Sequence, residues 1–108
     1  MTDNTAEHTT LVNATLIAIT ALPEAMFYPN ASGVGRTARG AFIRAGVPGG
    51  GDIMGTKSGH AVAIECKTGV GRPNPNQIRF RASWEKAKGK YFIVRSVDDA
   101  LSALAALQ

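Results

Sequence analysis

The sequence predicts a single α/β domain, residues 1–108, in which helices flank a mixed central sheet. Residues 61–67 and 91–95 are rich in β-branched and aromatic side chains, as strands are. A strong helix start at residues 74–77 lies between these two stretches. Two strands joined through a helix should pair in parallel by a right-handed crossover.

The first helix is expected to begin with Asn4 or Thr5 as its cap and to run to about Leu22, where Pro23 ends it. Apolar residues recur along it at helical spacing, so most of this helix is expected to be buried. Glu7 lies in its first turn, where a carboxylate interacts favourably with the helix dipole.

A short strand is expected over residues 25–28, followed by a loop over 29–35 and a second strand around 40–43. Arginines flank this second strand at Arg36, Arg39 and Arg44. The guanidinium group suits bidentate contact with phosphate, but charged side chains also protect an exposed edge strand from unwanted pairing. The sequence leaves both interpretations open.

Gly46 and the glycines at 49–51 precede Asp52, and their freedom would let a phosphate chain approach this carboxylate. A flexible linker is the alternative, and the absence of a GK[ST] sequence argues against a phosphate-binding P-loop. Residues 55–59 are expected to form a turn-rich segment before the strand at 61–67.

Side chains alternate between faces along the strand at 61–67. The apolar side chains expected to enter the core are Val62, Ile64 and Cys66. Glu65 and Lys67 share the other face, which small alanines leave open.

If Asp52 ends the preceding strand of a hairpin, its carboxylate comes close to that of Glu65. Two adjacent carboxylates repel unless a cation joins them, and oxygen ligands suit a hard ion such as Mg²⁺. With Lys67 beside a metal-associated water, the set indicates metal-assisted phosphodiester hydrolysis. A hairpin that merely carries surface charges is the alternative.

The loop over residues 68–73 is basic and contains Arg72. Asn74 is the expected N-cap of the next helix, and Gln77 falls at the third helical position, as in a capping box. This helix should end near Lys88. Its core-facing residues should be Phe80, Trp84 and Ala87. After the strand at 91–95, Ser96 should cap a last helix with Asp99 in its first turn.

The net charge of +4 favours a polyanionic partner. Cys66 is the sole cysteine, so no internal disulfide forms, and an inert buried thiol is expected. His8 and His60 have no partner at zinc-site spacing, although His60 could approach the acidic face from the turn. The apolar run at 16–22 is too short to span a membrane, and the N-terminus lacks the basic start of a signal peptide. These features predict an intracellular soluble protein.

Four stretches together resemble the VRR-NUC family of the PD-(D/E)xK nuclease superfamily: residues 49–53, 64–68, 74–80 and 89–96. The resemblance covers almost the whole chain. It implies a restriction-endonuclease-like αβββαβ core, here followed by a C-terminal helix. It also implies DNA cleavage that depends on Mg²⁺ or Mn²⁺.

In the family's pattern, Asp52 and Glu65 would be metal ligands, with the backbone carbonyl of Cys66 as a third. Lys67 would position the nucleophilic water, and Gln77 matches a glutamine that the family places near the site. The family also has a glutamate on the first helix, for which Glu7 is the best match and Glu24 the second.

Minimal members of the family resemble phage enzymes, which implies action in the cytoplasm of a bacterial host. The resemblance also implies a homodimer that acts on branched DNA such as four-way junctions. The arginines expected to contact DNA are Arg36, Arg39, Arg44 and Arg72. Two alternatives remain: a non-catalytic DNA-binding module of the same fold, and a small interaction protein that binds a structural cation. The carboxylate pair favours the nuclease, because DNA binding alone does not need two carboxylates facing a polyanion.

Overall fold

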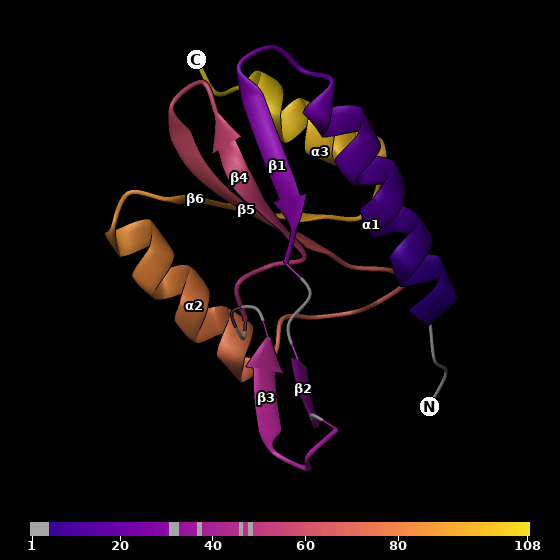
Figure 1. Ribbon diagram of the computed structural model, residues 1–108. Helices are drawn as coiled ribbons and strands as arrows, with labels where there is room; N and C mark the ends of the chain where they lie inside the picture. The colour runs from indigo at the N-terminus through magenta and orange to yellow at the C-terminus, as the bar shows by residue number, and fades with distance from the viewer. Residues whose placement is uncertain (1–4, 31–32, 37, 46, 48) are drawn as a thin grey trace.

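The structure, a computed structural model, describes residues 5–30, 33–36, 38–45, 47 and 49–108 (Figure 1). In chain order the elements are α1 (Thr5–Thr20), β1 (Ala25–Pro29), β2 (Gly33–Arg36), β3 (Phe42–Ala45), β4 (Ile53–Lys57), β5 (His60–Cys66), α2 (Pro75–Lys86), β6 (Lys90–Val94) and α3 (Val97–Ala105). Among the described residues, no helix is long and apolar enough to cross a bilayer.

Four of the strands form a mixed sheet in the order β1-β4-β5-β6. The strands β1, β4 and β5 are antiparallel neighbours, whereas β5 and β6, joined through α2, are parallel. With the β2–β3 hairpin set apart, the order is α1-β1-β4-β5-α2-β6-α3. This confirms the predicted mixed sheet with an αβββαβ core and a C-terminal helix.

The sheet is covered on both faces, with α1 and α3 together on one side and α2 on the other (Figure 1). The α1/α3 face buries the side chains that alternation along β5 assigned to the core: Val62, Ile64 and Cys66. On the α2 face, Phe80 and Trp84 stack at 5.3 Å between ring centroids and pack against Tyr91. The predicted division of β5 into two faces is therefore confirmed.

The central strand that precedes β5 differs from the prediction. Residues 53–57 form β4 instead of the expected turn-rich segment, and only Ser58 and Gly59 turn the chain. Gly55 lies between β1 and β5, and a Cβ there would meet the Met26 carbonyl oxygen at 2.0 Å. Glycine has a low strand propensity, but pairing on both sides overrides it.

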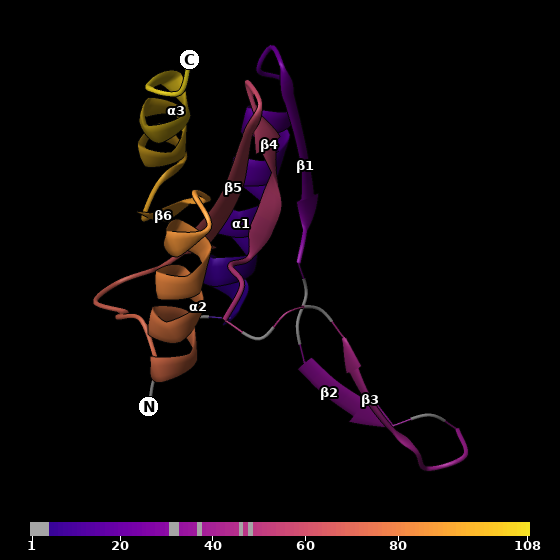
Figure 2. The same ribbon diagram turned by 90° about the vertical axis from the view of Figure 1, so that its left-hand side faces the viewer.

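The arginine-flanked segment is also not part of the main sheet. It forms a separate antiparallel hairpin, β2–β3, which projects away from the body of the domain (Figure 2). Arg39 lies at its exposed turn. The side chains of Arg36 and Arg44 are outside the part of the chain that the structure describes.

The helices differ from expectation in smaller ways. Among residues 6–20 of α1 only Thr15 and Ile19 are fully buried, and Ile17 is 74% exposed, so the expectation of a mostly buried helix is wrong. On α2 the helix ends at Lys86, and Ala87 is exposed instead of facing the core. Ser96 caps α3 as predicted, with its hydroxyl accepting a hydrogen bond from the Asp99 backbone N–H.

Candidate metal centre

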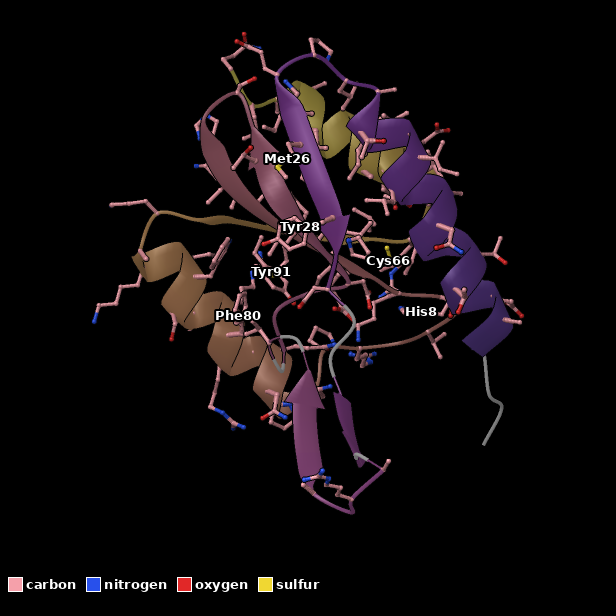
Figure 3. All side chains as sticks on the ribbon, in the orientation of Figure 1. His8, Met26, Tyr28, Cys66, Phe80 and Tyr91 are labelled. Atoms are coloured by element: carbon pink, nitrogen blue, oxygen red, sulfur yellow. The ribbon has the colours of Figure 1, made fainter. Side chains whose placement is uncertain are left out.

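Three side chains from separate elements converge at one end of the sheet. His8 comes from the end of the first turn of α1, Asp52 directly precedes β4, and Glu65 lies near the end of β5. One ligand atom from each lies within 4.8 Å of the others, and His8 Nε2 is 3.1 Å from Asp52 Oδ2. The Cys66 backbone N–H, from the last residue of β5, contacts the same Asp52 oxygen at 2.8 Å (His8 and Cys66 are labelled in Figure 3). This group could hold a metal ion.

Backbone pairing with β5 fixes the position of Asp52. Its N–H donates to the Ile64 carbonyl at 2.8 Å, and its side-chain Oδ2 accepts from the Cys66 N–H at 2.8 Å. Asp52 therefore directly precedes β4 and does not end an earlier strand, although an aspartate at a strand end was the arrangement considered from the sequence. The carboxylate still lies beside Glu65, because β4 and β5 are antiparallel neighbours.

The glycines before Asp52 serve the packing of the protein itself. Gly51 has a φ of +93°, and a Cβ there would lie 2.9 Å from the Ile64 carbonyl oxygen. A Cβ on Gly49 would lie 2.5 Å from the carbonyl oxygen of Asn76. At these two positions glycine lets the chain approach β5 and α2. Both glycines also line the cavity beside Asp52, and the approach of a phosphate chain there stays a prediction. Gly46 is outside the described residues.

Glu65 is buried, with 6% of its surface exposed. Its Oε2 accepts a hydrogen bond from Gln77 Nε2 at 2.8 Å and lies 3.3 Å from Lys67 Nζ. Burial raises the pKa of this carboxyl above its ordinary value, and the nearby charge of Asp52 raises it further, while Lys67 and His8 act in the opposite direction. The two carboxylates thus form an electrostatically strained pair that a bound cation would relieve.

Gln77 joins the start of α2 to this centre. Its Oε1 accepts from the Asn74 backbone N–H at 2.9 Å, while its own N–H donates to Asn74 Oδ1 at 2.9 Å, which completes the predicted capping box. The same Oε1 accepts from Lys67 Nζ at 2.9 Å. The capping contacts and the contacts to the acidic pair are therefore made by one side chain at once.

Cys66 contributes its backbone. Lys67 N–H donates to the Val94 carbonyl on β6, so alternation along the strand directs the Cys66 N–H and carbonyl to the opposite edge, where Asp52 lies. Burial raises the pKa of the Cys66 thiol to about 12, so the thiol stays protonated and inert, as expected.

An open cavity of about 310 Å³ adjoins the centre. Its polar lining includes His8, Asn30, Asp52, Glu65 and Gln77. The cavity gives the two carboxylates access to solvent and to a ligand, although Glu65 is largely covered.

Several residues predicted near the site lie elsewhere. Glu7 is exposed and is not part of the cluster, whereas its neighbour His8 is. Glu24 Oε1 accepts from the Ser58 hydroxyl at 3.4 Å, at the β4–β5 turn and so at the other end of these strands. His60 is at that end too, with Nε2 3.1 Å from the Gln108 carbonyl oxygen. Neither approaches Asp52.

Sequence reasoning missed His8, although α1 carries a feature that could have identified it. Helical spacing of seven and eleven residues places His8 on the same face as Thr15 and Ile19, the two fully buried residues of α1. Glu7 is one position, about 100°, away from that face. The helix periodicity therefore favours His8 as the residue that α1 turns toward the sheet.

The basic loop after β5 is held in place by a guanidinium clamp. Arg95 donates from Nη1 to the Gly69 carbonyl at 3.0 Å and from Nη2 to the Gly71 carbonyl at 2.8 Å. Arg72, in the same loop, is exposed. The clamp fixes the path of the chain between Lys67 and the start of α2.

No protein-family model matches the chain. No curated protein matches it either. The family assignment remains a prediction from the four sequence stretches.

Proposed function

We propose that the chain is a metal-dependent endonuclease that hydrolyses phosphodiester bonds in DNA. The observation that carries this proposal is the convergence of Asp52 and Glu65 with Lys67 and Gln77 beside an open cavity. Metal-assisted phosphoryl chemistry can use each of these groups: the carboxylate pair to hold an ion, and the ammonium group and the amide to position water and phosphate.

The residues that would hold Mg²⁺ or Mn²⁺ are the Asp52 and Glu65 carboxylates and the backbone carbonyl of Cys66. The donor set fits such an ion, because hard divalent cations prefer oxygen ligands. Repulsion between the Asp52 and Glu65 carboxylates, which adds to the effect of burial in raising the pKa of Glu65, also favours a cation between the two groups. When bound, the ion supplies Lewis-acid polarisation of the phosphate and acidifies an attacking water.

Lys67 is the proposed water-positioning residue. Its side chain is only 14% exposed, and its ammonium group is held between Glu65 Oε2 and Gln77 Oε1, so its direction is fixed before DNA arrives. From there it can hold an attacking water and offset negative charge that develops on the phosphate. Gln77 orients both groups, since its amide donates to Glu65 and accepts from Lys67.

Basic residues support DNA as the substrate. The projecting β2–β3 hairpin carries three arginines, Arg36, Arg39 and Arg44, and Arg72 lies on the loop after β5. Contacts of this kind bind the phosphate backbone without reading its sequence. We further propose that the chain acts as a homodimer on branched DNA such as four-way junctions, where paired sites could cut symmetrically.

The test is a cleavage assay on labelled four-way junction, flap, single-stranded and linear duplex DNA. Each is incubated with Mg²⁺, with Mn²⁺, with Ca²⁺ and with EDTA, and binding is measured in parallel. We expect cleavage of junction DNA with Mg²⁺ or Mn²⁺, none with EDTA, and binding without turnover in Ca²⁺, which coordinates less strictly.

Binding of DNA without cleavage under every ion would replace this proposal with that of a DNA-binding module of the same fold. Such a module would rely on the arginines alone. Size-exclusion chromatography of the protein–junction complex tests the dimer separately.

A further inference from the structure

We propose that His8 is itself a metal ligand, and that its imidazole makes the centre prefer a divalent transition-metal ion over Mg²⁺. The inference rests on the proposed function, since it specifies which ion the same centre takes. It departs from an all-oxygen site, which the sequence pattern of carboxylates alone suggests.

The first argument is the position of the ring. Two donor atoms bonded at about 2.1 Å to one ion at right angles are about 3 Å apart. His8 Nε2 and Asp52 Oδ2 are 3.1 Å apart. Both side chains also line the cavity that Glu65 borders, so the three donors face one shared space.

The second argument is that Asp52 does not need His8 as a hydrogen-bond donor. The Cys66 N–H already donates to Asp52 Oδ2 at 2.8 Å, closer than His8. Main-chain pairing on both sides holds the aspartate independently: its N–H donates to the Ile64 carbonyl and its carbonyl accepts from the Asn30 N–H. An imidazole used only to orient this carboxylate would therefore be largely redundant.

The third argument is access. The His8 side chain is 36% exposed and that of Asp52 is 23% exposed, so an ion can reach both from solvent. His8 is carried by a 16-residue helix whose inner face packs on the core, so the ring is presented from a rigid element.

The donor chemistry then sets the preference. Imidazole nitrogen binds Mn²⁺, Co²⁺ and Zn²⁺ with affinities that rise along the transition series, whereas Mg²⁺ favours oxygen ligands and keeps several waters. One imidazole and two carboxylates also balance the charge of a divalent ion. A glutamate in place of His8 would add a third carboxylate and restore the all-oxygen set that suits Mg²⁺.

The experiment measures metal affinity without DNA. Isothermal titration calorimetry with Mg²⁺, Mn²⁺ and Co²⁺ compares the wild-type chain with His8→Ala and His8→Glu. His60→Ala is the matched control, because His60 lies at the other end of β5 against Gln108. Thermal unfolding in EDTA checks that each variant is folded, and the visible spectrum of bound Co²⁺ reports directly on loss of a nitrogen ligand.

We expect His8→Ala to weaken Co²⁺ binding by about 100-fold and Mg²⁺ binding by about threefold or less, with Mn²⁺ between them. His8→Glu should shift the preference toward Mg²⁺, and His60→Ala should change neither affinity nor spectrum. Equal losses for all three ions in His8→Ala, or an unchanged Co²⁺ spectrum, would overturn the inference and leave His8 as a hydrogen-bonding neighbour of Asp52.

The result is separable from that of the cleavage assay. The expected metal selectivity in a chain that cuts no DNA would uphold the His8 ligand and reject the nuclease. If DNA cleavage depends on a metal but His8→Ala weakens the binding of all three ions equally, the nuclease is upheld and His8 is rejected as a metal ligand.

Discussion

At Gln77 a single amide group makes hydrogen bonds to Glu65, Lys67 and the backbone of Asn74. Two of these contacts belong to the proposed chemistry and one belongs to the start of α2. A substitution that keeps the capping contact and reverses the contact to Glu65 separates the two roles.

Gln77→Glu is that substitution. A carboxylate at this position still accepts from the Asn74 N–H and lies favourably at a helix N-terminus, so the unfolding midpoint should stay near wild type. It cannot donate to Glu65 and adds a negative charge beside it, so cleavage should fall clearly or change its metal dependence. As a control, Gln77→Ala should cost about 1 kcal/mol of stability, because the Asn74 backbone N–H loses its side-chain acceptor. Wild-type kinetics in folded Gln77→Glu would restrict Gln77 to capping.

Glu65 makes the stability of the metal-free protein depend on pH. Its folded-state pKa is raised above 4.5, so the folded state favours the protonated carboxyl. This contribution is fully present below the unfolded-state pKa and is lost as pH rises through the folded-state pKa. In EDTA, Glu65→Gln should therefore gain stability relative to wild type as pH increases from about 4 to about 8. Thermal unfolding across that range measures the difference, and a pH-independent difference would contradict it.

The sequence predicted these site residues to different degrees. Glu65 and Lys67 were placed on one face because strand alternation is strict, and Gln77 was placed by its cap spacing. His8 was not found, since its proximity to Asp52 depends on how α1 docks on the sheet. Helical spacing places His8 on the inner face of α1 with Thr15 and Ile19, but only the tertiary docking of α1 brings it to Asp52.

At the scale of elements, the segment that leads into β4 positions Asp52. Gly51 and Gly59 both have positive φ, at +93° and +82°, but they differ in surroundings. A Cβ on Gly51 would lie 2.9 Å from the Ile64 carbonyl oxygen, while a Cβ on Gly59 would meet nothing within 4 Å. Alanine substitutions at the two glycines therefore share the cost of the positive φ and differ in the contact with β5.

Gly59→Ala should cost about 1–2 kcal/mol, the usual penalty for a left-handed backbone conformation. Gly51→Ala should cost a further ~1–3 kcal/mol through overpacking against β5. It should also weaken metal binding, because Asp52 is the next residue. Urea denaturation and metal titration of both variants provide the comparison, and equal losses of stability would mean that the β5 contact is unimportant.

Elements with strong local determinants were predicted well. The α2 and α3 caps and the strands β5 and β6 have such determinants in Asn74, Ser96 and their β-branched runs. Residues 55–59 predict a turn because Gly55 and Ser58 are typical of turns, and only the two neighbours of β4 in the sheet make residues 53–57 a strand. The separation of the β2–β3 hairpin from the sheet likewise could not be predicted, because it depends on which strands pair across long stretches of the chain.

At the scale of the whole molecule, the net charge of +4 and the projecting hairpin predict electrostatic attraction to DNA. Replacing any one of Arg36, Arg39 or Arg44 by Gln should weaken binding similarly for all sequences and reduce the salt slope by about one unit. The control is Lys86→Gln, which also removes one positive charge but at the end of α2 far from Gln77. It should change the salt slope less. Fluorescence anisotropy at several salt concentrations tests this, and loss confined to one DNA sequence would indicate base readout instead.

Cleavage of labelled four-way junction DNA by Asp52→Asn tests the central claim most directly. Asparagine keeps an oxygen to accept from the Cys66 N–H, so the fold and DNA binding should be retained, but it removes one of the two charges proposed to hold the metal. With Mn²⁺ or Mg²⁺ we predict that wild type cuts the junction and that Asp52→Asn cuts it at least about 100-fold more slowly, with DNA affinity within about threefold. Cleavage by folded Asp52→Asn at the wild-type rate would contradict the proposed metal-dependent nuclease.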